Sequence, residues 1–251
     1  MNMNKYFHAV EHYFFSLVSQ EQIDYGSLIA FTTGVFASGL NPAIVQRYDH
    51  MLLDKIKKVI HHYQTKNIPW ALVVPDYLHP NTLQAKLSQE GLKWTGDGVA
   101  MGVLLSEFDH SLTNTMQIRE MRDDMHTWHI PLVQAFGASP ETPDLYIKRH
   151  HEAIKKGEIY HFSAFIDNTV VSSLTLSCCG AHARIDDVAT LPTHQKRGFA
   201  SDLMTFALKF AKQLGKEDCF LEASPDGLSL YRRLGFLELF KNHYYEIQDL
   251  S

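Results

Sequence analysis

The chain has 251 residues, of which 45% are hydrophobic and 20% are charged, and its formal net charge is −5. This composition is typical of a globular protein with a sizeable core, and it excludes collagen-like, low-complexity and largely disordered chains. The mild acidity argues against a protein that binds nucleic acid by broad neutralisation of phosphate charge. The length suits one large domain or two modest ones.

Three cysteines, Cys178, Cys179 and Cys219, are too few for a disulfide framework and favour reduced thiols. Residues 1–10 contain polar and charged residues throughout and lack the apolar run and the small-residue cleavage site of a secretory leader. No run approaches the roughly 18 apolar residues of a membrane-spanning helix. We therefore expect a cytoplasmic protein with no membrane partner.

The first half mixes helix and strand patterns. In chain order the patterns predict a helix over 48–67, a buried strand over 69–75 and a second helix over 81–91. Two strands follow within 92–105, and then a polar linker over 107–114. The last two strands are separated by Gly96-Asp97-Gly98, which is a hairpin signal.

The second half has clearer patterns. They predict a strand over 116–121, helices over 123–136 and 142–156, and strands over 160–166, 170–177 and 183–190. An amphipathic helix is then expected over 201–214, a strand over 219–223, a short helix over 228–234 and two final strands over 236–240 and 243–247.

The loop before the amphipathic helix carries the most chemistry. A strand ends, a loop with Lys196, Arg197 and Gly198 follows, and a helix is expected from Ser201. The start of a helix presents unpaired N–H groups and partial positive charge, so it can hold a phosphate. Gly198 allows close approach of the backbone, and the two cationic side chains add donors. The segment predicts a pyrophosphate site; the alternative is an ordinary strand–helix loop with solvated charges.

The loop resembles the Gln/Arg-x-x-Gly-x-Gly/Ala loop of GNAT-type N-acetyltransferases, with the residues Gln195-Lys196-Arg197-Gly198-Phe199-Ala200. Residues 185–192 before it resemble the fourth strand of that family. Residues 230–236 resemble its Leu-Tyr-x-x-Leu-Gly-Phe corner. The resemblance covers about residues 115–248. It implies an α+β GNAT acyl-CoA N-acyltransferase fold, with a mixed central sheet flanked by helices.

The first half resembles, more weakly, the degenerate N-terminal half of two-domain GNAT proteins. A short helix between a proline and a glycine recurs, once over 80–92 and once over 225–236. The first half has no counterpart of the Gln-Lys-Arg-Gly loop, so the resemblance implies that it no longer binds coenzyme. We expect a tandem of two GNAT-like halves, a degenerate N-terminal domain over 1–112 and a catalytic domain over 113–251.

The resemblance also implies acetyl-CoA as the acyl donor, held between splayed fourth and fifth strands and on the loop N–H groups. The residues that it assigns to the coenzyme are Val188, Ala189, Thr190, Gln195, Lys196, Arg197, Gly198, Phe199, Ala200 and Ser201. Ala200 departs from the more usual glycine. We expect no metal, because the adjacent pairs His61-His62 and His150-His151 lie on predicted helices, where neighbouring side chains diverge.

Tyr231 matches the family tyrosine that protonates the departing thiolate; the alternative is a tyrosine that only packs beneath the fifth strand. The general base stays open among Asp186, Asp187 and Glu222, acting directly or through water, and each could instead be structural. Strand alternation places Asp186 and Asp187 on opposite faces of the sheet.

These features predict an N-acetyltransferase that acts on a primary amine of a small molecule or peptide, by direct attack in a ternary complex. The expected partners are acetyl-CoA and the amine, with no nucleic acid, in a monomer or homodimer. The alternative is a non-catalytic acyl-CoA-binding sensor or scaffold. Such a protein would need the phosphate loop but neither Tyr231 nor a strand carboxylate.

Overall fold

The computed structural model of the protein describes residues 3–113, 115–137 and 142–247. The chain divides into two compact units, each built from two separate stretches. Unit 1 comprises the residues up to Leu17 together with Ala100–Leu239, and unit 2 comprises Val18–Val99 together with the residues from Phe240. This division differs from the expected boundary at residue 112, because the first helix packs within unit 1 and two long strands contribute residues to both units.

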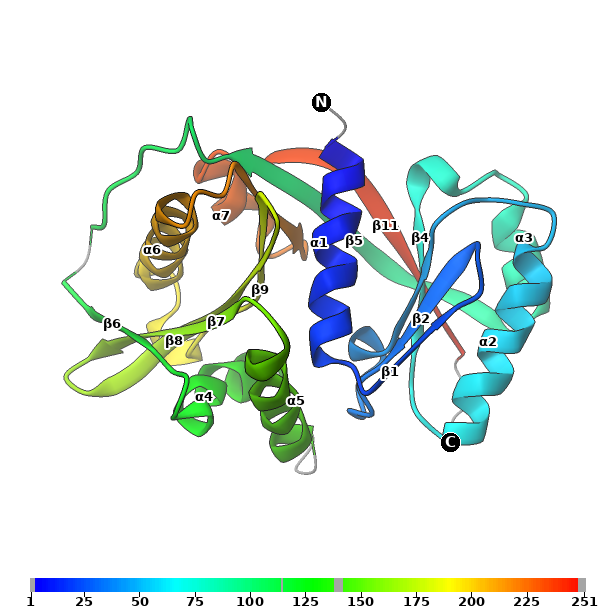
Figure 1. Cartoon of the computed structure of the whole chain (residues 1–251), viewed down its shortest axis with the longest axis horizontal. Helices are drawn as coiled ribbons and strands as arrows, with labels where there is room; N and C mark the ends of the chain where they lie inside the picture. The colour runs from blue at the N-terminus through cyan, green and yellow to red at the C-terminus, as the bar shows by residue number, and fades with distance from the viewer. Residues whose placement is uncertain (1–2, 114, 138–141, 248–251) are drawn as a thin grey trace. The chain divides into compact units, whose positions relative to one another are not determined.

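Unit 1 contains a mixed sheet with the strand order β5-β10-β9-β8-β7-β6 (Figure 1). The strands are β5 (Leu92–Leu104), β6 (Gln117–Glu120), β7 (Ile159–Ile166), β8 (Thr169–Cys179), β9 (His182–Thr190) and β10 (Asp218–Ala223). β10 pairs with β9 in parallel, whereas the neighbouring pairs from β9 to β6 are antiparallel.

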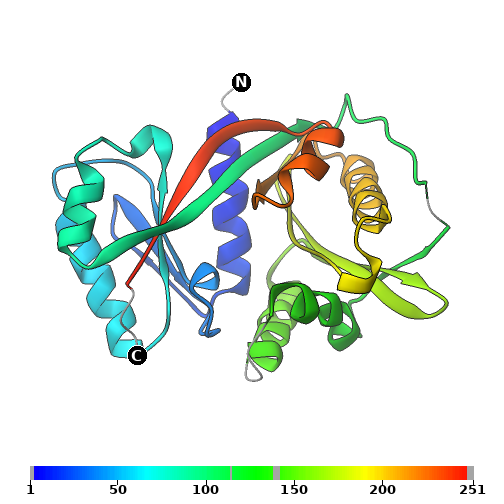
Figure 2. The ribbon, with the colours of Figure 1, turned by 180° about the vertical axis from the view of Figure 1, so that it is seen from behind.

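Helices cover both faces of this sheet. α4 (Met125–Phe136) and α5 (Thr142–Lys156) pack on one face, where His161 of β7 lies 2.7 Å from His150 of α5. α6 (Phe199–Gln213) packs on the other face, where the rings of Phe162 and Phe206 are 5.2 Å apart (Figure 2). Consecutive residues of β7 thus contact opposite layers, as strand alternation requires.

A helix that the sequence patterns do not predict, α1 (Met3–Val18), lies on the α5 side of the unit 1 sheet. The ring of Phe7 packs edge-to-face on Phe220 of β10 at 6.3 Å, and Phe14 lies 6.2 Å from His150 of α5. Tyr13 accepts a hydrogen bond from the backbone N–H of Glu158 at 3.0 Å. α1 is therefore an integral layer of unit 1.

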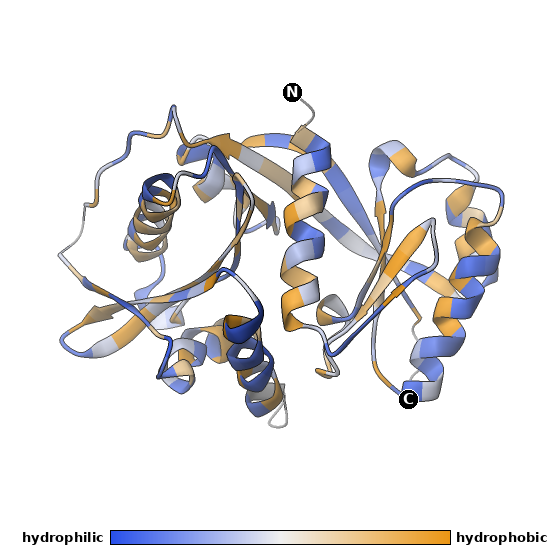
Figure 3. Cartoon of the chain, in the orientation of Figure 1, coloured by the Kyte–Doolittle hydropathy of each residue, from blue (hydrophilic) through white to orange (hydrophobic). Residues whose placement is uncertain are grey.

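Unit 2 contains the strand order β1-β2-β3-β4-β11-β5. Its other strands are β1 (Glu21–Asp24), β2 (Leu28–Thr32), β3 (Pro42–Val45), β4 (Ala71–Pro75) and β11 (Leu237–Ile247), and its helices are α2 (Leu52–Lys66) and α3 (Leu83–Gln89). The apolar stripe of α2 is buried, while polar residues occupy its other side (Figure 3). Tyr63 stacks on Trp70 with ring centroids 5.0 Å apart and donates to the carbonyl of Phe31 at 2.8 Å.

The predicted break in the strand at Gly96-Asp97-Gly98 is wrong, because β5 runs through it. The carboxylate of Asp97 accepts a hydrogen bond from Trp94 Nε1 at 2.9 Å and lies 2.8 Å from His243 Nδ1 of β11. These partners give the polar residue a place within the sheet, so no turn forms.

The predicted break between 236–240 and 243–247 is also wrong, because both segments belong to β11. Asn242, which interrupts the apolar pattern, is fully buried and pairs with Pro75 in the β4 ladder.

Among the residues that the structure describes, no helix is long and apolar enough to cross a bilayer.

The buried side chain of Asn41 organises the loop between β2 and β3. Its Oδ1 accepts from the backbone N–H groups of Thr33 at 3.0 Å and Gly34 at 3.2 Å. Its Nδ2 donates to three backbone carbonyls, those of Val35 at 2.8 Å, Ala37 at 3.0 Å and Pro69 at 2.9 Å. One side chain therefore satisfies five backbone groups that have little access to water.

Asn41→Ala should lower the free energy of unfolding by about 3 kcal/mol or more, because each buried polar group left unsatisfied costs about 1–3 kcal/mol. Urea unfolding followed by circular dichroism measures this loss. Asn81→Ala, at an exposed position, is the matched control and should change stability by less than about 0.5 kcal/mol. Equal urea midpoints for Asn41→Ala and the control would contradict the role of this side chain.

Candidate active site

The parallel pairing of β9 and β10 stops before either strand ends. Cα partners are His182 with Asp218 and Arg184 with Phe220, the last pair of the ladder, whereas β9 continues to Thr190 and β10 to Ala223. Beyond this pair the facing backbone edges of the two strands can bond to an extended ligand. The predicted coenzyme segment, Val188 to Thr190, lies in this unpaired part of β9.

The loop after β9 leads directly into α6 in a conformation suited to an anion. Lys196 has a φ of 60° and Gly198 has a φ of 86°, both in the left-handed region. Gly198 is the N-cap residue of α6 and supplies no side-chain cap to the first turn. The first-turn N–H groups therefore remain available to an anion at the positive end of the helix dipole.

Two contacts anchor this loop. Phe199 is buried, and the Arg197 guanidinium lies 5.2 Å from the centroid of its ring. Asp202, buried in the first turn of α6, accepts hydrogen bonds from Thr113 N at 2.9 Å and Thr113 Oγ1 at 3.1 Å. Residues 195–198 are exposed. The helix start is thus fixed while the loop that wraps it faces solvent.

β9 contains a bulge at Asp187, whose φ is 58°. Thr175 of β8 pairs with Asp186, and Ser173 pairs with Ala189, so two residues of β9 oppose Leu174 alone. The extra residue interrupts the alternation of side chains.

The bulge places Asp186 and Asp187 on the same face of the sheet, and the expectation of opposite faces is wrong. Asp186 pairs in register with Thr175, whose side chain shares the face of His161 and α5. Thr175 Oγ1 donates to Asp187 Oδ2 at 2.7 Å, so the Asp187 carboxylate lies on that face too.

Arg184 is the centre of a buried charge cluster. Its Nε lies 2.9 Å and 3.0 Å from the two carboxylate oxygens of Asp186, and its guanidinium lies 5.2 Å from the ring centroid of Phe7 in α1. Burial disfavours its charge, but Asp186, Glu11 and Glu222 outweigh that effect and raise the pKa of Arg184. Burial in turn raises the pKa of Asp186, although Arg184 opposes this rise.

Asp187 has a different environment. Tyr146 of α5 donates to its Oδ1 at 2.5 Å, and Thr175 holds its Oδ2. Burial, reinforced by the charge of Asp186, raises the pKa of Asp187 to about 7, although the two hydroxyl donors lower it. A carboxylate with a pKa near neutrality can accept and release a proton under ordinary conditions.

A pair of buried histidines lies behind Asp187. His150 Nδ1 is 2.7 Å from His161 Nε2, and His150 Nε2 is 3.8 Å from Asp187 Oδ2. Burial lowers the pKa of His161 to about 3 and that of His150 well below its usual value. Both imidazoles are therefore neutral near pH 7.

Tyr231 lies in α7 (Leu228–Arg233), directly after β10. Its ring is 8% exposed and packs on Phe236 with centroids 6.1 Å apart. A Cβ at Gly227 would lie 2.7 Å from this ring, so only glycine permits the contact. Burial, together with the charge of Asp186, raises the pKa of Tyr231 to about 12, and the hydroxyl stays protonated at neutral pH.

The structure thus places Asp186 and Glu222 in the electrostatic surroundings of Arg184 and Tyr231 in those of Asp186, while Asp187 bonds to Tyr146 of α5. Sequence reasoning missed the polar neighbours of these carboxylates, which are Glu11, Tyr146, His150 and Arg184. Tyr146 and His150 share one face of α5 at i and i+4 spacing, a signal that the sequence did contain.

A pocket of about 460 Å³ opens between α4 and α5. Its lining combines apolar and titratable residues, namely His126, His129, Ile130, Val133, Gln134, Asp144 and Ile147. Burial and the nearby His126 lower the pKa of His129, so its ring is neutral near pH 7.

Residues 118–236 match the model of the acetyltransferase (GNAT) family. No curated protein matches the chain at a significant level. The match covers the strands, the loop and the α7 corner described above.

Solved structures resemble the whole chain. A GCN5-related N-acetyltransferase from Kribbella flavida has a TM-score of 0.73 at 13% identity, over 97% of this chain and 95% of its own. One from Sphaerobacter thermophilus has a TM-score of 0.62 at 15% identity, over 88% and 77%. A tandem GNAT protein from the clavulanic acid biosynthesis pathway has a TM-score of 0.58 at 10% identity, over 89% and 79%. The predicted GNAT fold is confirmed.

The raised pKa of Asp187 has a consequence for stability. The unfolded carboxyl has a pKa of about 3.9, so between about pH 4 and 7 the folded state binds a proton that the unfolded state does not. The free energy of unfolding of the wild type, relative to Asp187→Asn, should therefore fall as the pH rises through this window. Urea unfolding of both proteins at several pH values measures the difference. If the difference in the free energy of unfolding between the two proteins does not vary with pH, the raised pKa of Asp187 is refuted.

Proposed function

We propose that this chain, whose residues 118–236 belong to the acetyltransferase (GNAT) family, transfers an acetyl group from acetyl-CoA to a primary amine of a small molecule or peptide. The observation that carries the proposal is the end of the β9–β10 ladder at Arg184 and Phe220, on the same unit as an uncapped helix start. One extended ligand with phosphates at one end suits both features.

The phosphates of the donor would bind the loop. The N–H groups of the first turn of α6 carry the partial positive charge, and Lys196 and Arg197 add full charges. The pantetheine arm would follow the free edge of β9. The residues in these roles are Val188, Ala189, Thr190, Gln195, Lys196, Arg197, Gly198, Phe199, Ala200 and Ser201.

The charge of the site favours a cationic acceptor. The carboxylates of Glu11, Asp186 and Glu222 act electrostatically on the guanidinium of Arg184. Carboxylates in excess over cations attract a protonated amine. The amine must then lose a proton before it can attack a thioester.

Asp187 is the general base in our proposal, directly or through one water. Its pKa of about 7 suits proton transfer near neutral pH. Asp186 is less suited because its oxygens are engaged by Arg184. Tyr146 and Thr175 act as positioning residues, since each donates to one oxygen of Asp187.

The reaction would proceed in a ternary complex without an acyl-enzyme. The amine nitrogen, having given a proton to Asp187, attacks the thioester carbonyl carbon. The tetrahedral intermediate loses its extra N–H proton to water and collapses with cleavage of the carbon–sulfur bond, and Asp187 releases its proton to solvent. Tyr231 protonates the departing thiolate, and its own proton is restored from solvent. The products are the amide and free coenzyme A.

We also propose that the chain is a tandem in which unit 2 is a degenerate GNAT-like half. The order α2, β4, α3, β5 repeats as α6, β10, α7, β11, which supports this. In addition, α3 and α7 are both short helices between a proline and a glycine. The loop at residues 195–198 precedes α6, which connects the parallel strands β9 and β10. Its counterpart in unit 2 is the segment 46–51 before α2, which connects the parallel strands β3 and β4, and this segment contains no glycine.

A panel of primary amines, assayed with acetyl-CoA and a free-thiol reagent, tests the function. On any accepted amine, Tyr231→Phe should lower kcat by about 10²–10⁴-fold, since general acid catalysis supplies that range. The Kd for coenzyme A, measured by calorimetry, should barely change. Near-wild-type kcat in this variant would falsify the acid role. Tight coenzyme binding without turnover of any amine would favour the sensor or scaffold instead.

Substitutions at Gly198 test the phosphate loop. Asparagine and aspartate have nearly the same shape and both tolerate a positive φ, which is 86° here. Gly198→Asp should bind coenzyme A at least about 10-fold more weakly than Gly198→Asn, because only the aspartate places a negative charge beside the phosphates. Calorimetry on both variants measures this ratio. Equal affinities would contradict phosphate binding at this loop.

A further inference from the structure

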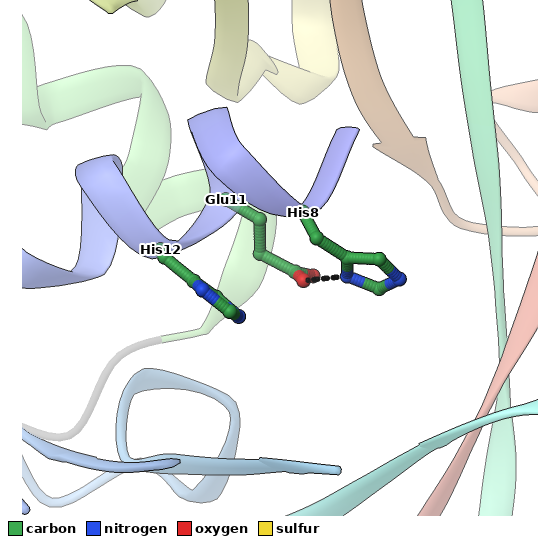
Figure 4. A group of neighbouring side chains, drawn as sticks. All are labelled: His8, Glu11 and His12. Carbon is green, nitrogen blue, oxygen red and sulfur yellow. Dashed lines mark hydrogen bonds and ion pairs between the residues drawn. The ribbon is translucent and has the colours of Figure 1, made fainter. Parts of the chain in front are cut away.

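Helix α1 brings three side chains with metal-binding atoms to one side of unit 1. His8, Glu11 and His12 occupy positions i, i+3 and i+4, which share one face of a helix. One ligand atom from each residue lies within 4.8 Å of those of the other two. Figure 4 shows the three side chains leaving the helix on the same side, with Glu11 beside His8.

The three groups are ordered by their surroundings. Glu11 is 2% exposed, and one of its carboxylate oxygens lies 2.9 Å from His8 Nδ1. The rings of His8 and His12 have centroids 6.1 Å apart, and both residues are half-buried. The ligand atoms therefore start close together on one rigid element, and little side-chain entropy is lost when they converge on one ion.

The charge near the cluster also suits a cation. The charge of Arg184 acts on Glu11, and Arg184 forms an ion pair with Asp186 at 2.9 Å. Glu11 and Glu222 add two more carboxylates to the electrostatic surroundings of Arg184. Three carboxylates around one guanidinium leave an excess of negative charge.

We propose that His8, Glu11 and His12 form a zinc site. Two imidazole nitrogens and one carboxylate oxygen are a donor set that zinc uses with a fourth position open to water, at bond lengths of about 2.0–2.2 Å. Magnesium and calcium prefer oxygen ligands alone, so the imidazoles select against them. On binding, the ion replaces the hydrogen bond between His8 and Glu11.

The zinc site shares Glu11 with the carboxylates around Arg184, but zinc binding itself does not depend on acetyl transfer. The adjacent histidine pairs alone predict no metal site. The H-x-x-E-H spacing of residues 8–12 indicates one only when these residues form a helix, as they do in α1.

Calorimetric titration of the chelator-treated full-length protein with zinc chloride tests the proposal. The wild type should bind one equivalent. His12→Ala should bind it at least about 10²-fold more weakly, since even loss of an outer-shell partner costs about 10–100-fold. Glu11→Gln should weaken binding similarly, and circular dichroism checks its folding because Glu11 is buried. If that variant misfolds, the half-buried His12 decides the question alone.

The matched control is His61→Ala, which removes an exposed histidine of α2 and should leave the affinity unchanged. Magnesium chloride should give no binding heat. The proposal is overturned if the wild type takes up no zinc at micromolar concentration. It is equally overturned if His12→Ala and His61→Ala bind zinc alike, because the binding would then be adventitious.

Discussion

The backbone of β9 at Asp187 is the constraint on which the candidate site depends. A non-glycine residue at a φ of 58° is costly unless its surroundings hold it. Here hydroxyls from α5 and β8 hold the carboxylate, through Tyr146 and Thr175. The bulge places two consecutive carboxylates on one face. It lies three residues past the last β9–β10 pair, so the departure from regular geometry and the opening of the sheet occur together.

Two adjacent carboxylates acquire different properties from their neighbours. Asp186 faces a guanidinium that opposes the effect of burial, whereas Asp187 faces neutral hydroxyls and neutral imidazoles. Burial therefore dominates at Asp187 and brings its pKa to about 7. Environment, and not residue type, separates a charge-balancing group from one that can exchange a proton.

Apart from α1, the sequence predicted the helices and strands of unit 1 well, because they have strong periodicity and end at glycine, proline or polar residues. It predicted the loop and helix start around Gly198, because their backbone requirements leave a local signature, while phosphate binding there stays a prediction. It could not predict the bulge, since a single left-handed aspartate has no pattern of its own. The sequence also could not predict the electrostatic surroundings of Arg184, because Glu11, Glu222 and Asp186 come from three separate elements. Breaks were predicted at Asp97 and Asn242 because polar residues usually end strands, and here both find partners inside the sheet.

The composition of each unit from two distant stretches of chain bears on how the protein folds. During synthesis, α1 leaves the ribosome about a hundred residues before most of the strands and helices on which it packs, and its apolar side chains stay uncovered meanwhile. Unit 2 is mostly made early, yet β11, its partner for β4, is made long after β4. Neither unit can complete its contacts until a distant segment of the chain has been made. Contacts of such long sequence separation slow folding, so unit 2 can complete its sheet only after most of unit 1 has been synthesised.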